Sequence, residues 1–225
     1  MISIAIDGPS GAGKSTISKL SAKELNFIYV DTGALYRAIG YAAMQKKISC
    51  DEIEKVTELL NSISVRLVFN EKGEQRVMLS DEDVSDYIRT PEVSMMASAI
   101  SALPIVREYL LDLQRNLAKT NNVIMDGRDI GTVVLPNAQI KIFLFASPED
   151  RAKRRYDELC EKGMQVNYDD VLQDIITRDY NDSHRETAPL KPAENAIMVE
   201  TTGNTLEQSV QKLLSIMKEN IEKLK

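Results

Sequence analysis

The sequence contains few of the residue types that build disulfide frameworks and metal centres. Among its 225 residues there are two cysteines, Cys50 and Cys160, and one histidine, His184. The two cysteines are far apart and lack the C-x-x-C spacing of zinc and redox sites, so we expect neither a disulfide framework nor a zinc site. This cysteine usage fits a reducing compartment, and we predict a cytoplasmic protein.

An excess of positive charge and long apolar runs are also missing. Lysine and arginine together number 28 against 34 aspartates and glutamates, which gives a formal net charge of −6. This balance argues against a broad surface for nucleic acid or anionic membranes. No apolar run approaches the length of a transmembrane helix, and the chain begins with an expected strand and not with a basic signal peptide. We therefore expect neither nucleic acid nor membrane as a partner, and we take the chain to be a monomer.

A glycine-rich stretch near the N-terminus is the most informative part of the sequence. It matches G-x-x-x-x-G-K-[ST] over residues 8–15, follows the apolar run 2–6 and leads into the helical pattern 17–25. In this context backbone N–H groups cradle nucleotide phosphates and Lys14 reaches the β- and γ-phosphates. The residues expected to bind ATP or GTP are Gly8, Pro9, Ser10, Gly11, Ala12, Gly13, Lys14, Ser15 and Thr16. The alternative is a glycine-rich turn that only joins strand to helix.

A second short strand is predicted at residues 27–30, and a helix follows it. Asp31 or Thr32 can cap that helix, and Arg37 lies one turn into it. Ligands of α/β sheets bind at the carboxyl ends of the strands, so Arg37 can clamp a second phosphate there. The spacing allows a solvated helix arginine equally well.

The pattern changes to alternating, strand-like runs at 65–69 and 75–79, which a turn signal at 70–74 separates. Antiparallel hairpins are foreign to a parallel α/β core, so residues 63–90 are predicted to form an inserted subdomain. The acidic run 81–86 lacks the glycine and terminal glutamate of a calcium loop, and we interpret it as a solvated turn.

Carboxylates and an arginine follow the buried-type strand predicted at 123–126. The sequence there reads Asp126-Gly127-Arg128-Asp129. Such side chains at the carboxyl end of a strand are poorly explained by packing, and they favour a functional loop. The alternative is a turn held by an Arg–Asp pair.

A helix beginning near residue 148 carries three arginines on one face. Ser147 is expected to cap it, and Arg151, Arg154 and Arg155 share the face by their spacing. On an acidic protein this face is a candidate anion clamp, although an ordinary exposed face is the alternative. A second helix is predicted at about 168–180, followed by a polar, arginine-bearing loop that contains His184.

Taken together, five predicted strands alternate with helices, which is typical of a five-stranded parallel sheet with helices on both faces. A GTPase is disfavoured, because the sequence has no N-K-x-D and no suitable D-x-x-G. Several arginines are instead predicted to converge on one end of the sheet: Arg37, Arg128, Arg151, Arg154, Arg155, Arg178 and Arg185. So many guanidinium groups suit two phosphate-bearing substrates under a mobile basic lid, as in a small-molecule kinase. Phosphoryl transfer can proceed without histidine, so we interpret His184 as a loop residue and not as a general base.

Several motifs together resemble bacterial cytidylate kinase, from about residue 2 to the final helix. They are the segments at 7–14, 31–37, 126–134 and 178–190. The resemblance implies a P-loop kinase fold that transfers the ATP γ-phosphate to CMP or dCMP. It also implies a core of 1–62 and 91–225 with a helical lid near 148–185. Residues 63–90 would then be the acceptor-side insert.

The resemblance further implies the roles of individual residues. The catalytic residues would be Lys14, Arg128, Arg151, Arg155 and Arg185. The CMP-binding residues would be Thr32, Arg37, Ser98, Arg107, Arg128, Asp129, Arg178, Asp182 and Arg185. An aspartate accepts from the exocyclic amine of cytosine, so Asp129 would disfavour uracil.

Some questions stay open at this stage. Mg²⁺ is expected on a hydroxyl beside Lys14, where Ser15 fits the general phosphate-loop pattern and Thr16 the G-K-G-T pattern of many nucleoside monophosphate kinases. The alternatives are a kinase for another small acceptor, such as shikimate, and a nucleotide-dependent switch with no acceptor. The sequence does not fix the preference between CMP and dCMP or a residual activity on UMP.

Overall fold

The computed structural model describes residues 1–71 and 73–224. It divides the chain into two compact units, which we call the first unit (Met1–Tyr29 and Asn121–Lys225) and the second unit (Val30–Thr120). The predicted turn at 70–74 includes Lys72, which lies outside the described residues.

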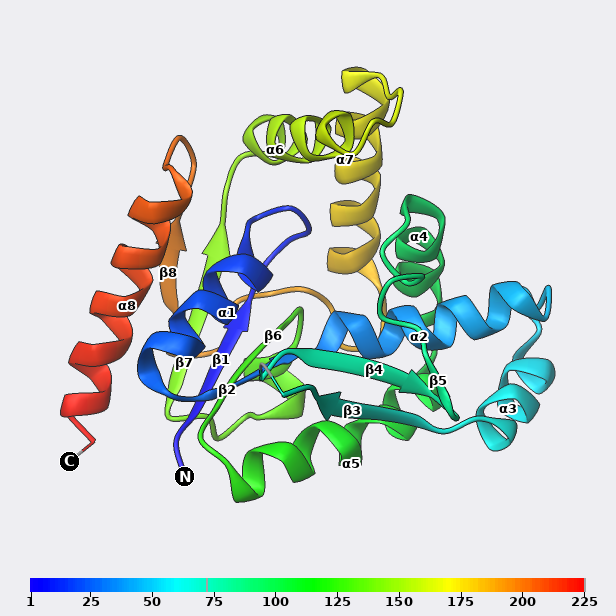
Figure 1. Cartoon of the computed structure of the whole chain (residues 1–225), viewed down its shortest axis with the longest axis horizontal. Coiled ribbons are helices and arrows are strands. Elements are labelled where there is room, and N and C mark those ends of the chain that lie inside the picture. The colour runs from blue at the N-terminus through cyan, green and yellow to red at the C-terminus, as the bar shows by residue number, and fades with distance from the viewer. Residues whose placement is uncertain (72, 225) are drawn as a thin grey trace. The chain divides into compact units, whose positions relative to one another are not determined.

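A five-stranded parallel sheet flanked by helices is the main element of the fold, as predicted (Figure 1). Its strand order is β2 (Ile28–Asp31), β6 (Val123–Gly127), β1 (Ser3–Asp7), β7 (Ile140–Phe145) and β8 (Ile197–Glu200). The strands β1, β2 and β6 each lie within one residue of their predicted bounds, 2–6, 27–30 and 123–126. Since β1 pairs with both β6 and β7, the segments that leave these strands at their carboxyl ends are neighbours.

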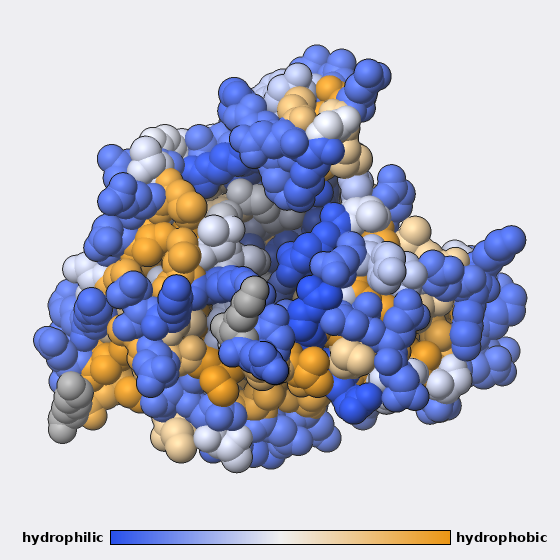
Figure 2. Space-filling model, viewed as in Figure 1, coloured by the Kyte–Doolittle hydropathy of each residue, from blue (hydrophilic) through white to orange (hydrophobic). Residues whose placement is uncertain are grey.

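In the first unit, α1 (Lys14–Leu25) and α8 (Leu206–Glu222) pack against one face of this sheet (Figure 1). The core there joins Ile4 and Ile6 of β1 to Ile17 of α1 and to apolar side chains of α8, which recur with helical spacing. Figure 2 shows apolar side chains gathering on the outer surface around α1 and α8. Burial of this cluster fixes β1, and therefore the loop that follows it.

Two further helices of the first unit, α6 (Pro148–Glu161) and α7 (Tyr168–His184), pack against each other over a small apolar core (Figure 1). Ser147 caps α6 as predicted, because its hydroxyl accepts from the Asp150 N–H at 3.2 Å. The outer surface of this helix pair is mainly hydrophilic (Figure 2).

The predicted end of α7 was wrong by four residues. The helix continues through His184, so the polar residues 178–184 are helical and do not form a loop. A run of charged and polar side chains resembles a loop in sequence, but here Asp182 is buried, Arg178 and Asp179 are half-buried, and the other residues of the run are exposed. His184 itself stacks on Tyr180, with ring centroids 4.1 Å apart.

The second unit combines four helices with the antiparallel insert in the described residues. Its helices are α2 (Thr32–Gln45), α3 (Ile53–Ser62), α4 (Pro91–Ile100) and α5 (Pro104–Thr120). They share one apolar core, in which α2 contributes the small residues Ala34, Ala38 and Ala42 that allow close helix packing. A methyl group added at Gly40 would lie 3.2 Å from the Ala97 backbone, which shows how closely α2 and α4 approach.

The predicted antiparallel insert is present as a three-stranded sheet of β3 (Val65–Phe69), β4 (Gln75–Leu79) and β5 (Glu82–Asp83). The acidic run 81–86 differs from a wholly solvated turn, since Arg76 binds both Asp83 and Asp86 at 2.8 Å. Among the described residues, no cluster of three His, Cys, Asp or Glu could hold a metal ion. Nor is any described helix long and apolar enough to cross a membrane.

Candidate active site

The glycine-rich loop lies between β1 and α1, where the sequence predicts it. Gly11 and Gly13 adopt φ values of 73° and 82°, in the left-handed region that favours glycine. At Gly8, with φ 151°, an added methyl group would lie 1.9 Å from the carbonyl oxygen of Leu144 on β7. The loop therefore packs so closely against β7 that there is no room for a side chain at Gly8. Its glycines also allow the main chain to form an anion-binding cradle.

Lys14 is the first residue of α1 and is only 5% exposed. Its ammonium group donates to the carbonyl of Pro9 at 2.7 Å, which folds the side chain back over the loop. Burial and then the nearby Arg128 guanidinium lower the pKa of Lys14 well below its usual value, against the opposing effect of Asp126. A buried cation with another cation nearby favours the binding of an anion such as a phosphate.

A carboxylate lies next to the loop at the end of β6. Asp126 accepts a hydrogen bond from the Ser15 hydroxyl at 2.8 Å and another from the Tyr29 hydroxyl at 3.1 Å. Of the two candidate hydroxyls, Ser15 and not Thr16 has its oxygen on this carboxylate. A hydroxyl and a carboxylate oxygen side by side form the donor set that Mg²⁺ prefers in phosphate-loop proteins.

A second carboxylate, Asp7, fixes the segment that follows β6. It is buried and accepts from the backbone N–H groups of Ile130 and Gly131, both at 2.7 Å. Burial raises the pKa of Asp7 to about 7, although the two N–H groups act in the opposite direction. A methyl group added at Gly131 would lie 3.1 Å from the Ala193 Cβ and 3.3 Å from the Asp7 carboxylate, so these neighbours would have to shift to accept a larger residue. The two bonds join the residue before the phosphate loop to η1 (Ile130–Val134), a π-helical turn.

Charged residues from the segment after β6 and from the end of α7 meet in the first unit. The Arg128 Nε donates to Asp182 at 2.8 Å, and Arg185 lies 3.8 Å from Asp129. Burial opposes ionisation of Asp182, but Arg128 and then Arg178 keep the pKa of this carboxyl below its usual value. The structure thus brings together the residues predicted after β6 and those predicted near 178–185.

The three arginines of α6 make different contacts. Arg151 is 2% exposed, and its guanidinium donates to the carbonyls of Ala146 and Ser10, both at 2.9 Å, and to the carboxylate of Asp179. It therefore connects α6 with both the phosphate loop and α7. Arg154 and Arg155 are half-buried; they donate to the carbonyl of Thr201 at 2.6 Å and to Glu158 at 2.8 Å, respectively.

In the second unit, the buried carboxylate of Asp31 begins α2. It accepts the N–H of Ala34 at 3.0 Å as a helix cap, and it binds Arg37 at 3.0 Å and Arg89 at 3.3 Å. Burial opposes its ionisation, but Arg37 and then Arg89 keep the pKa of Asp31 below its usual value. Thr32, also buried, is the first helical residue. The cap is therefore Asp31 and not Thr32.

Ser98 and Arg107 meet around the turn between α4 and α5. Arg107 donates to the carbonyl of Ser101 at 2.9 Å, while the Ser101 hydroxyl donates to the carbonyl of Ser98 at 2.8 Å. The Arg107 guanidinium also lies 5.5 Å from the ring centroid of Tyr36, within the range of a cation–π contact. The two residues predicted from the resemblance are thus close together within this unit.

Comparison with known proteins identifies the family. A family model described as cytidylate kinase matches residues 4–219. A cytidylate kinase from Caldicellulosiruptor saccharolyticus is 53% identical over 215 residues, which cover 96% of this chain and 95% of that protein. Another, from Carboxydothermus hydrogenoformans, is 47% identical over 214 residues, covering 95% of this chain and 96% of that protein. The chain belongs to the cytidylate kinase family.

Membership of the cytidylate kinase family makes the chain a phosphotransferase of the nucleoside monophosphate kinase class. A solved structure of an uncharacterized protein from Eubacterium ventriosum is similar, with a TM-score of 0.50 at 12% identity. The match covers 97% of this chain and 99% of that chain. At this identity the similarity concerns the fold alone.

Several residues that organise the site were not predicted from the sequence. Asp7 was read only as part of a family motif, and Asp126 was not given a role although it ends a strand. Gln75 and Arg89 both lie within residues 63–90, and no spacing in the sequence connects them to Asp31. Only the folded chain shows these contacts, because their partners are more than forty residues away, as for Gln75 and Asp31 (44 residues).

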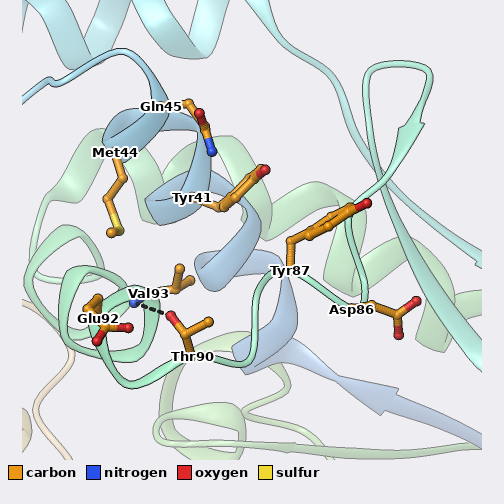
Figure 3. Close-up of a pocket in the computed structure, with 8 residues that line it drawn as sticks. All are labelled: Tyr41, Met44, Gln45, Asp86, Tyr87, Thr90, Glu92 and Val93. Atoms are coloured by element: carbon orange, nitrogen blue, oxygen red, sulfur yellow. Dashed lines mark hydrogen bonds between the residues drawn. The ribbon is translucent and has the colours of Figure 1, made fainter.

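A pocket of about 530 Å³ in the second unit does not contain any of the predicted site residues. Figure 3 shows the residues that line it: Tyr41, Met44, Gln45, Asp86, Tyr87, Thr90, Glu92 and Val93. The rings of Tyr41 and Tyr87 are nearly parallel, with centroids 6.1 Å apart. We assign no part of the nucleotide site to this pocket.

Proposed function

We propose that the chain transfers the γ-phosphoryl group of ATP to CMP or dCMP, giving ADP and CDP or dCDP. The observation that carries the proposal is the match to the cytidylate kinase family over residues 4–219, together with a buried phosphate loop around Lys14. A single phosphate loop would fit many ATPases, whereas the family match covers both units.

The donor nucleotide is proposed to bind along residues 8–16. Lys14 and the loop N–H groups neutralise its phosphates and fix their orientation. Ser15 and Asp126 would hold Mg²⁺, which when bound neutralises charge on the β- and γ-phosphates. The adjacent hydroxyl and carboxylate oxygens support this choice over Thr16.

The acceptor is proposed to bind through the residues that the family resemblance implies. Asp129 accepts from the cytosine amine, and Arg107 and Ser98 bind the other polar atoms of the base. Arg178 and Asp182 contact the sugar. The acceptor phosphate is bound by Thr32, Arg37, Arg128 and Arg185.

The residues of the chain act mainly by positioning and by electrostatic stabilisation. Guanidinium groups already ordered by carboxylates, such as Arg128 on Asp182, present fixed positive charge to the transferring group and need little reorganisation. We propose that α6 and α7 form the lid, with Arg151 and Arg155 on it, and that closure excludes water from the reaction. The insert near 63–90 is proposed to be the acceptor-side subdomain.

A panel of acceptors tests the proposed function. With ATP and Mg²⁺, ADP release is measured against CMP, dCMP, UMP and AMP. We expect kcat/KM for CMP or dCMP to exceed that for UMP by at least ~100-fold, because uracil presents an acceptor to the Asp129 carboxylate. A higher kcat/KM for UMP or AMP would contradict the assignment of the base.

The proposal also includes a cytoplasmic monomer without nucleic-acid or membrane partners. The two distant cysteines and the net charge of −6 support this part. Light scattering after gel filtration is expected to give a mass near 25.2 kDa. A mass twice as large would contradict the monomer.

A further inference from the structure

One side chain of the insert, Gln75, binds the main chain at the start of α2. The amide oxygen of Gln75, the first residue of β4, accepts the backbone N–H of Asp31 at 2.9 Å. Its amide nitrogen lies 3.4 Å from the backbone carbonyl of the same residue. A primary amide that meets both main-chain groups of one residue resembles the pairing of one strand with the next.

The anchored residue also organises two arginines. The Asp31 side chain is buried, and it binds Arg37 at 3.0 Å and Arg89 at 3.3 Å. Gln75 thus holds the main chain of the same residue whose carboxylate orients Arg37. The Arg37 Nε is buried and has no hydrogen-bond partner among the described residues, so this guanidinium keeps an unsatisfied donor.

The insert is firmly built around Gln75. The next residue, Arg76, binds the carboxylates of Asp83 and Asp86, both at 2.8 Å. In addition, Val77 donates its N–H to the Ser85 hydroxyl at 2.8 Å. Because these contacts hold β4 in place, the side chain of Gln75 is held in place too and can fix the main chain of Asp31.

We propose that Gln75 is a positioning residue of the acceptor-phosphate site, which fixes the backbone of Asp31 and thereby the guanidinium of Arg37. This inference rests on the proposed function in that Arg37 binds the phosphate of CMP. It gives the insert a defined task in catalysis, which is to hold Arg37 ready before the acceptor binds. Because Arg37 is already ordered before the acceptor binds, less conformational entropy is lost on binding. Gln75 thereby strengthens binding of the acceptor although it does not contact the acceptor itself.

The test replaces Gln75 with Met, which has a similar length but cannot form either bond. In Gln75→Met we expect the KM for CMP to rise about tenfold, as for the loss of one hydrogen bond. The KM for ATP is expected to change by less than about twofold, because the phosphate loop belongs to the first unit. A matched control is Gln45→Met, the same substitution at an exposed position in the second unit, where we expect wild-type constants.

A double-mutant cycle distinguishes positioning from general stabilisation. If Gln75 acts through Arg37, then Gln75→Met has no further effect on the KM for CMP in an Arg37→Ala background. An undiminished effect in that background would overturn the proposal. So would an unchanged KM for CMP in Gln75→Met when the wild type phosphorylates CMP.

A readout without substrate separates this inference from the proposed function. Amide hydrogen exchange at Asp31 is expected to be faster in Gln75→Met than in the wild type and in Gln45→Met. Equal exchange would overturn the anchoring step, even if CMP were not the acceptor. Failure of the wild type on CMP, with faster exchange in the variant, would instead contradict the proposed function alone. If Gln75→Met does not fold, Gln75→Asn, whose amide is one methylene shorter, is expected to show the same KM and exchange effects.

Discussion

Three buried aspartates at strand ends each hold more than one donor. Asp7 accepts two main-chain N–H groups, Asp126 accepts two hydroxyl groups, and Asp31 accepts a helix N–H and two guanidinium groups. A carboxylate has two oxygens with several lone pairs, so it can join segments that are far apart in the sequence. At the scale of single residues, these three buried carboxyl groups orient the arginines, hydroxyl groups and loop N–H groups around them.

The pKa of Asp7 leads to a prediction on stability. Since burial raises it from 3.8 to about 7, the folded chain keeps this proton between pH 4 and 7 while the unfolded chain loses it. The stabilisation is complete below pH 4, is lost as pH rises through 7, and is then constant. We therefore expect the unfolding free energy of the wild type, relative to Asp7→Asn, to be lower at pH 8 than at pH 5.

Urea unfolding of both proteins at the two pH values measures this difference. Other titrating groups are common to both chains, so their effects cancel in the comparison. A relative stability that is constant, or that increases with pH, would show that Asp7 is ionised throughout this range.

Asp129 is predicted to discriminate the base. In Asp129→Ala the acceptor for the cytosine amine is lost, and we expect kcat/KM for CMP to fall by at least ~100-fold. The Kd for ATP, measured by calorimetry, is expected to stay within about twofold of the wild type, because the loop around Lys14 is unchanged. An equal loss of ATP affinity would place Asp129 at the donor and not at the acceptor.

Among the elements, those specified by local patterns were predicted and those specified by distant contacts were not. The strand–loop–helix at residues 2–25 can be predicted from the local sequence alone, because it has apolar periodicity and glycines at the spacing of a phosphate loop. The β-insert likewise follows from alternation around a turn signal. The end of α7 did not, because the buried residue of its last turn is the polar Asp182, which pairs with the distant Arg128 just after β6. The link from Gln75 to Asp31 has no local signature at all.

We expect the packing of α6 against α7 to be stabilised by the buried Arg151 of α6 and the carboxylate of Asp179 on α7. Removing that carboxylate in Asp179→Ala leaves a 2%-exposed guanidinium with only carbonyl acceptors. We expect a loss of about 2 kcal/mol in unfolding free energy, as for a hydrogen bond to a charged group.

The matched control for this pair is Asp157→Ala on α6, which removes an exposed partner of Lys153. It is expected to change the unfolding free energy by less than about 0.5 kcal/mol. Urea unfolding of the two variants gives the comparison. Similar losses in both would mean that Arg151 does not depend on Asp179.

At the scale of the whole molecule, the two units carry different parts of the chemistry. The first holds the phosphate loop, Asp126, Arg128 after β6, and Arg178 and Arg185 at the end of α7, whereas the second holds Asp31 with Arg37 and Arg89. The sequence similarity to the cytidylate kinase family extends through both. The proposed two-substrate kinase would use both sets of arginines, whereas a nucleotide-dependent switch has no need of the second set.

Transfer of a labelled phosphoryl group tests the central claim most directly. The chain is incubated with Mg²⁺, CMP and ATP that carries a radioactive γ-phosphate, and the products are separated by chromatography. We predict that the label appears in CDP, that inorganic phosphate stays at background, and that Lys14→Met abolishes the transfer. Label released only as inorganic phosphate, or remaining in ATP, would contradict the account.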